Sequence, residues 1–103
     1  MTFEVIENTE DRTSETVIRR KIYRTDDPQY PSGYRYALHY GFLDGQGVIF
    51  RYDNENRTPG RHERHTPDGI EEIEFPGMME LRDRFVTKFR TFHDHEHTQN
   101  HVW

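Results

Sequence analysis

The chain has 103 residues, of which 31% are hydrophobic and 32% charged, and its formal net charge is −5. This length predicts one domain, and an aromatic content of 14% excludes wholesale disorder, although the low apolar content predicts a thin two-layer fold. The absence of cysteine excludes disulfides and zinc–thiolate sites. No stretch approaches transmembrane length and the first residues show no signal-peptide pattern, so we expect a cytoplasmic protein without membrane contact.

The basic residues are 12 Arg and 2 Lys, against 19 acidic residues. Few lysines, many carboxylates and no cysteine are typical of a halophilic, salt-adapted cytosol. Arginine is also the residue that binds phosphate with a planar fork of donors. A net acidic protein still binds nucleic acid when its arginines cluster on one face. The composition therefore leaves both interpretations open.

The first 33 residues predict two strands and a loop. Apolar residues within 2–7 indicate a first strand, and the polar run 7–15 indicates a turn. The β-branched stretch 16–24, TVIRRKIYR, is typical of a strand. Two prolines and a glycine in 25–33 predict a loop.

The next twenty residues predict a β-hairpin. In 34–42, YRYALHYGF, tyrosine, leucine and phenylalanine alternate with polar or small residues, which is the period of a half-buried strand. The segment 44–47, DGQG, indicates a turn, and 48–53, VIFRYD, continues the alternation.

The register of this hairpin follows from its apolar residues. Both apolar sets share one face only if Tyr40 lies opposite Phe50 and Leu38 lies opposite Tyr52. That pairing requires a loop of odd length, which suits a glycine bulge.

The second face of the hairpin is then polar. The same register places His39 opposite Arg51 and Ala37 opposite Asp53. Because Ala37 and Gly41 are small, we expect them to leave this face open. The sequence therefore predicts a concave polar surface that carries Arg35, His39, Arg51 and Asp53.

The last part of the chain predicts a short strand and a helix. Residues 69–75, GIEEIEF, end at Pro76 and Gly77. After them, apolar residues recur at steps of three or four, which predicts an amphipathic helix that covers the aromatic face of the sheet. This stripe consists of Met78, Leu81, Phe85, Phe89 and Phe92.

The predicted fold class is α+β. We expect an antiparallel meander of four to five strands with one C-terminal helix packed on one face, forming a single domain over residues 1–92. Residues 93–103 form a polar, histidine-rich tail that we predict to be flexible. Its histidines, His93, His95, His97 and His101, would bind a divalent metal only loosely.

Candidate chemistry starts at Asp53 and Asn54, where the predicted strand ends. One interpretation is that both side chains only stabilise the turn, as Asx residues often do. The other is that Asp53 orients a histidine or holds a metal. His62 and His65, in a predicted loop, are either two solvated histidines or a metal pair that Asp53 or Glu63 would complete.

Together these residues suit phosphodiester cleavage, which needs a base, an acid and cations on the developing charge. The candidate catalytic residues are Asp53, His62, His65 and His39. The candidate substrate-binding residues are Arg35, Arg51, Asn54, Arg61 and Arg64. The cofactor stays open between none and a divalent metal held by Asp53, His62 and His65.

The same region carries a family likeness. The YDN motif at 52–54, the histidines after it, EEIEF at 71–75 and the following Leu/Phe helix resemble the TumE family of small toxins from toxin–antitoxin systems. The resemblance runs from about Tyr34 to Phe89 and assigns family positions to Asp53, Asn54, His62 and His65. It implies a helix-turn-helix antitoxin that neutralises this chain, and a toxin that acts on RNA or on translation.

Two hypotheses of function follow. The first is a small ribonuclease-like toxin that uses the Arg/His/Asp face. The second is a binding module without catalysis that grips nucleic acid or a protein through the same face, with steep salt dependence if phosphates are its target. A free sheet edge also leaves a homodimer open.

Overall fold

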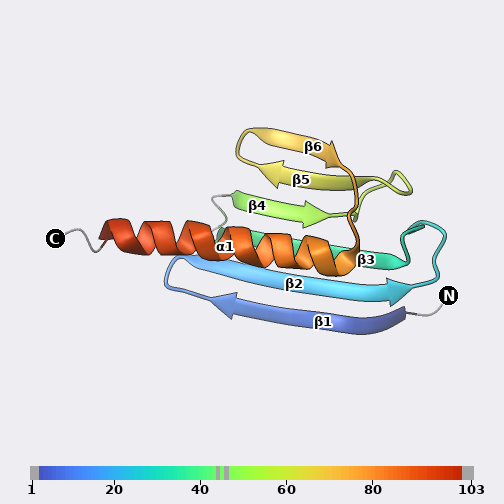
Figure 1. Ribbon diagram of the computed structural model, residues 1–103, viewed down its shortest axis with the longest axis horizontal. Coiled ribbons are helices and arrows are strands. Elements are labelled where there is room, and N and C mark those ends of the chain that lie inside the picture. The colour runs from blue at the N-terminus through green and yellow to red at the C-terminus, as the bar shows by residue number, and fades with distance from the viewer. Residues whose placement is uncertain (1–2, 44, 46, 101–103) are drawn as a thin grey trace.

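The chain folds into one antiparallel sheet with a helix on one face. The computed structural model describes residues 3–43, 45 and 47–100, and side chains as far as 91. Six strands lie in chain order across the sheet, and Figure 1 shows the helix running lengthwise over its middle strands. The elements are β1 (Phe3–Arg12), β2 (Thr16–Thr25), β3 (Tyr34–Phe42), β4 (Val48–Asp53), β5 (His62–Thr66), β6 (Gly69–Ile73) and α1 (Met78–Asn100). The α+β meander with a C-terminal helix is confirmed, but it has six strands where four to five were predicted.

The predicted hairpin register is confirmed. Tyr40 pairs with Phe50 and Leu38 pairs with Tyr52. The register then shifts, so that Gly41 pairs with Val48, which is the irregularity that an odd loop requires. Two turn glycines have positive φ, +78° at residue 45 and +129° at residue 47, a backbone conformation that disfavours any other residue.

One correction concerns the first hairpin. β1 continues to Arg12 through a segment predicted as a turn, and only residues 13–15 connect it to β2. β1 is an edge strand whose side chains are almost all exposed. Such a strand is held by backbone pairing with β2 and needs no alternating apolar pattern, so the sequence gives no period-two signal there.

The second correction is β5, which replaces the predicted loop around the two histidines. Its sequence, HERHT, contains no apolar residue, and its only buried side chain is His62. β4 and β6 satisfy its backbone on both sides. A strand whose inward position is a histidine resembles a polar loop in sequence, which explains why it was missed.

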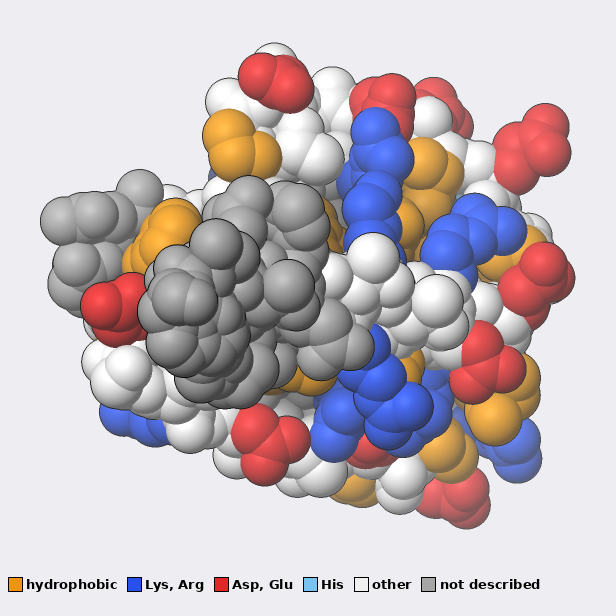
Figure 2. Space-filling model, turned by 60° about the vertical axis from the view of Figure 1, so that its left-hand side comes forward, with side chains coloured by type: hydrophobic (Ala, Val, Ile, Leu, Met, Phe, Trp, Pro, Cys, Tyr) orange, Lys and Arg blue, Asp and Glu red, His pale blue; other side chains and the backbone are white. Residues whose placement is uncertain are grey.

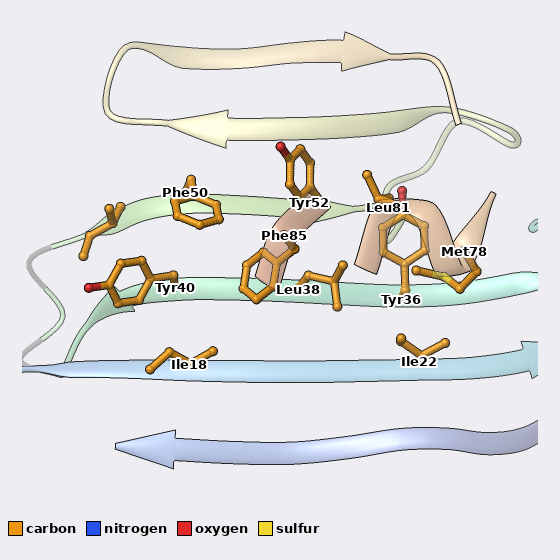
Figure 3. Close-up of a cluster of buried hydrophobic side chains, with 11 residues drawn as sticks. Ile18, Ile22, Tyr36, Leu38, Tyr40, Phe50, Tyr52, Met78, Leu81 and Phe85 are labelled. Carbon is orange, nitrogen blue, oxygen red and sulfur yellow. The ribbon is translucent and has the colours of Figure 1, made fainter. Parts of the chain in front are cut away.

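The core lies between the sheet and α1. Side chains from β2, β3 and β4 point toward the first half of the helix (Figure 3). Phe85 is fully buried, with its ring centroid 5.2 Å from that of Phe50. The cluster consists of Ile18, Ile22, Tyr36, Leu38, Tyr40, Ile49, Phe50, Tyr52, Met78, Leu81 and Phe85. The predicted stripe is confirmed as far as Phe89, which packs against the cluster, whereas the side chain of Phe92 lies outside the described residues.

The helix reaches further than its apolar stripe. It extends to Asn100 and so includes part of the predicted tail 93–103. The side chains of His93, His95 and His97, and residue His101 as a whole, lie outside the described residues. The domain limit at residue 92 stays a prediction.

An ion pair ties the helix to the edge of the sheet. Arg82 donates two hydrogen bonds to Glu7 on β1, at 2.7 and 3.0 Å, and Arg20 lies 3.2 Å from the same carboxylate. The hydrogen bonds from Arg82 lower the pKa of Glu7 below its usual value. This contact connects α1 to a strand that lies beyond the core cluster.

We expect Phe85→Ala to reduce the free energy of unfolding by about 3–5 kcal/mol, because it opens a cavity where the helix meets the hairpin. Met79→Ala is the matched control, since Met79 lies on the same helix but is 67% exposed. It should change the unfolding free energy by less than about 0.5 kcal/mol. Urea denaturation followed by circular dichroism measures both. Equal losses would contradict the assignment of Phe85 to the core.

Candidate functional site

The face of the sheet opposite the helix carries side chains in rows that cross the strands. The central pairs are as predicted, with His39 opposite Arg51 and Ala37 opposite Asp53. Continuing the pairing across all strands gives one row of Glu10, Arg19, His39, Arg51, His65 and Ile70. The next row is Asn8, Lys21, Ala37, Asp53, Glu63 and Glu72. We call this surface the polar face.

Asp53 is the centre of a charged cluster on the polar face. Its side chain is only 5% exposed, and its Oδ2 accepts a 2.7 Å hydrogen bond from Arg51 Nε. His65 Nε2 lies 3.2 Å from the same oxygen. Arg51 also reaches Glu55, at 3.5 Å, and Glu55 in turn accepts a 2.8 Å bond from Arg35. Three residues predicted for the site, Arg35, Arg51 and Asp53, therefore belong to one connected network.

His39 lies beside this network in its neutral form. Its Nδ1 is 3.4 Å from Arg51 NH1. Burial, and then the charges of Arg51 and Arg19, lower the pKa of His39 to about 4. At neutral pH this imidazole is therefore unprotonated and able to accept a proton.

Gly41 makes room for that imidazole. A Cβ atom at residue 41 would lie 2.6 Å from His39 Nε2 and 3.0 Å from the carbonyl oxygen of Gly47. The ring thus fills the space that we expected to stay open above Gly41, and Ala37 is buried as well. A hollow of about 340 Å³ lies next to the ring, and its lining includes His39, Arg12 and Arg19.

Asn54 has a structural task. Its side chain accepts a 3.0 Å hydrogen bond from the backbone N–H of Tyr36 and donates a 2.7 Å bond to the backbone oxygen of Tyr34. It thereby extends the pairing of β3 beyond the end of β4. Asp53 also supports the turn, since its Oδ1 accepts a 3.2 Å bond from the backbone of Glu55. The turn interpretation and the site interpretation therefore both apply to Asp53.

His62 lies on the opposite face from the cluster, because residues three apart on a strand point in opposite directions. It is 6% exposed, and its ring stacks on Phe75 at a centroid distance of 4.3 Å. Its Nδ1 is 2.8 Å from the hydroxyl oxygen of Tyr36. Desolvation lowers its pKa. The structure does not bring His62 together with His39, Asp53 or His65.

The remaining predicted arginines also separate. Arg61 lies at the edge of the cluster, where its Nε donates a 2.6 Å hydrogen bond to Glu63. Arg64 pairs with Glu71 at 2.6 Å and alternates with Glu63 and His65, so it points to the helix side. Basic and acidic side chains are interspersed over the surface seen in Figure 2.

The structure adds residues that sequence reasoning did not select. Arg19 and Lys21 enter the rows through β2, whose register with β3 was not predicted. Lys21 makes no ion pair among the described side chains. A second hollow, of about 530 Å³, lies at the other end of β3 and is lined by Phe3, Val5, Asn8, Lys21, Tyr23, Thr25, Asp27, Tyr30, Arg35 and Glu55. The sequence did not indicate this aromatic lining, because its residues come from β1, β2 and the 25–33 loop, which meet only in the folded protein.

The residues able to hold a metal differ from those predicted. Asp53, Glu63 and His65 each offer a ligand atom, and these atoms lie within 4.8 Å of one another. Glu63 takes the place that His62 had in the predicted set, because Glu63 and His65 are two apart on β5 and share a face.

This small α+β protein, with a charged cluster on the open face of its sheet, falls in a family of toxins. A family model described as Toxin TumE matches residues 3–93, and the chain belongs to that family. Searches of curated proteins and of solved structures give no significant match. Membership in a toxin family implies an antitoxin partner. Within the described residues, no helix has the length and apolarity needed to cross a membrane.

The low pKa of His39 gives a pH dependence of stability. The unfolded chain takes up this proton near pH 6.5, whereas the folded chain resists it down to about pH 4. Stability from this group is therefore complete above pH 6.5 and falls as the pH drops toward 4, by at most about 3 kcal/mol before solvent screening.

We expect His39→Gln to flatten the pH dependence of the unfolding free energy between pH 6.5 and 5, above the range where most carboxylates titrate. Urea denaturation at half-unit pH steps measures it. His62, whose pKa is also lowered, makes stability fall as the pH drops in the native protein and in the variant alike. Only the difference between the two unfolding curves therefore reports on His39. Parallel curves of unfolding free energy against pH for the native protein and the variant would contradict a buried, neutral His39.

Proposed function

We propose that this TumE-family toxin cleaves RNA at the polar face. The observation that carries the proposal is the adjacency of His39, Arg51, Asp53 and His65 on three neighbouring strands. Phosphodiester cleavage needs a base, an acid and a cation. His39 offers a neutral imidazole, and Arg51 offers a guanidinium held by the buried carboxylate of Asp53. His65 offers a second imidazole beside that carboxylate. Family membership supports the toxin role and the antitoxin partner.

The reaction that best suits these groups is internal transfer within the RNA chain. His39 takes the proton from a ribose 2′-hydroxyl, and the 2′ oxygen forms a bond to phosphorus. The bond from phosphorus to the 5′ oxygen breaks, and His65 gives the leaving oxygen a proton, which the proton taken up by His39 later replaces. The products are a 2′,3′-cyclic phosphate and a 5′-hydroxyl end, and no water is consumed.

Cations for the phosphate come from β1, β2 and β4. Arg51 lies between His39 and Asp53, so it is placed to contact a phosphate that His39 serves. Arg19 and Arg12 line the hollow beside His39, and both are held by the exposed carboxylate of Glu10, at 2.6 and 2.9 Å. Exposed ion pairs of this kind are weak, so a phosphate competes for these arginines at small cost.

The larger hollow supports a single-stranded substrate. Tyr23 and Tyr30 line it, and Arg35 lies 5.8 Å from the Tyr30 ring centroid. Aromatic rings and arginine planes bind the faces of unpaired bases. The two hollows lie toward opposite ends of β3, about 20 Å apart along the strand. A few nucleotides of RNA would span that length and reach His39, which lines the smaller hollow.

The second candidate is a binding module without catalysis, and one observation favours it. Almost every cation of the polar face is already paired with a carboxylate, as Arg35 is with Glu55 and Arg61 is with Glu63. A face with such balanced charge is less attractive to RNA than a basic stripe and would suit a protein partner. The helix-turn-helix antitoxin and the homodimer stay predictions under both candidates.

We expect His39→Gln to lower the rate of RNA cleavage by about 100-fold or more, because it removes the base. His62→Gln is the matched control, since it makes the same change on the opposite face. It should lower stability but leave the cleavage rate of the folded protein within about threefold. End-labelled single-stranded RNA, with a 2′-O-methyl version that lacks the nucleophile, measures both.

Three outcomes would count against this assignment. Equal losses in the two folded variants would place the base elsewhere. Cleavage of the 2′-O-methyl RNA would exclude the internal transfer reaction. RNA binding that falls steeply with salt, without cleavage, would favour the binding module.

Gly41→Ala tests the position of His39 without removing any functional group. The added methyl would lie 2.6 Å from His39 Nε2, so the ring must shift from its position beside Arg51. We expect a loss of cleavage of about tenfold or more, with a small change in stability, because positioning errors of about 1 Å are costly in catalysis. Gly33→Ala is a poor control, since its φ is +87°. Ala37→Gly, on the same strand and face, serves instead and should keep its activity.

A further inference from the structure

We propose that Asp53, Glu63 and His65 bind a divalent transition-metal ion on the polar face. As a metal site it stands by itself, and its role in the reaction rests on the proposed RNA cleavage. The three residues come from β4 and β5, where Asp53 pairs with Glu63 across the strands and His65 follows on the same face.

The spacing of the ligand atoms suits an ion. His65 Nε2 lies 3.2 Å from Asp53 Oδ2 and 3.5 Å from Glu63 Oε1. Two ligands that each lie about 2.1 Å from one ion, at tetrahedral or octahedral angles, are separated by about 3.0–3.4 Å. The cluster therefore needs only small side-chain shifts to close around a metal.

The side chain of His65 has an imidazole nitrogen that no hydrogen bond occupies among the described residues. This atom, Nε2, is inaccessible to solvent. It faces two carboxylates at short distances, but the angles are not those of a hydrogen bond. A buried imidazole nitrogen that lies beside two carboxylate oxygens and makes no hydrogen bond of its own is suited to metal binding.

The neighbouring arginines leave one ligand oxygen of Glu63 free, whereas the ligand oxygen of Asp53 also contacts Arg51. Arg61 binds Glu63 through Oε2, at 2.6 Å, whereas the atom that faces His65 is Oε1. Arg51 and His65 share Asp53 Oδ2, and Oδ1 supports the turn. Charged groups bonded to a ligating carboxylate commonly orient it around the ion.

The donor set indicates the class of metal. Imidazole favours Zn²⁺ or Fe²⁺ over Mg²⁺ and Ca²⁺, and the two carboxylates also suit Mn²⁺. Three protein ligands leave coordination positions for water or a phosphate oxygen, as in catalytic sites. The side chains of His65 and Glu63 are 24% and 14% exposed, so the site lies close to the surface. In the cleavage reaction, an ion held by Asp53, Glu63 and His65 would supply positive charge that stabilises the phosphate, while His39 acts as the base.

Titration of the purified full-length chain with Mn²⁺ tests the site. We expect one ion per chain by calorimetry and by the loss of the free Mn²⁺ spin-resonance signal. Glu63→Gln and His65→Gln should each weaken binding at least tenfold. Glu72→Gln is the control, because Glu72 also contacts Arg61, at 3.4 Å, but offers no ligand, and it should bind as the native chain does.

The outcomes separate this inference from the proposed function. The metal site would be overturned if the native chain bound neither Mn²⁺ nor Zn²⁺. It would also be overturned if the folded Glu63→Gln variant bound Mn²⁺ as tightly as the native chain does. RNA cleavage that continues in EDTA would then keep the proposed function, with His65 as the acid. Metal binding without any RNA cleavage would keep the site and overturn the function. Cleavage abolished by EDTA and restored by Mn²⁺ would support both.

Discussion

A single helix covers only one face of the six-stranded sheet, and this limit governs the rest of the molecule. With 31% hydrophobic residues, the chain has enough apolar side chains for one interior layer, which the hairpin and α1 fill. The other face must satisfy its polar groups without a second layer. It does so largely through ion pairs between neighbouring rows, such as Arg51 with Asp53 and Arg61 with Glu63, which compensate the like charges of the facing residues Asp53 and Glu63. The charged cluster is thus a consequence of the thin fold.

Strand periodicity, more than sequence proximity, decides which groups meet. His62 and His65 are three residues apart, yet one stacks on Phe75 in the core and the other lies beside Asp53. His39 and Arg51 are twelve residues apart and are direct neighbours. A site assembled this way from adjacent strands has its geometry set by backbone hydrogen bonds, which makes it more rigid than a cluster of loop residues.

The parts of the fold that could be predicted are those with one apolar face. In the hairpin, aromatic residues alternate strictly, so the register was predictable to the residue, and with it the meeting of His39, Arg51 and Asp53. β5 and the second half of β1 have no such alternation, because backbone pairing and contacts of polar side chains hold them in the sheet. Without β5, no argument from sequence could show that His62 turns inward or that Glu63 joins the cluster.

The polar face divides into two halves, and Arg51 lies on the border between them. Arg19, Lys21 and Arg35 make the β2–β3 half basic, whereas Asp53, Glu63 and Glu72 make the other half acidic. If Arg51 turns toward a phosphate beside His39, the nearly buried carboxylate of Asp53 loses its closest positive partner. An unpaired buried charge is unfavourable, so a cation on Asp53, Glu63 and His65 would stabilise the state in which Arg51 serves the substrate. The metal ion and Arg51 would then act together. The ion would compensate the charge of Asp53 when Arg51 turns toward the phosphate, and that movement of Arg51 would free Asp53 to bind the ion.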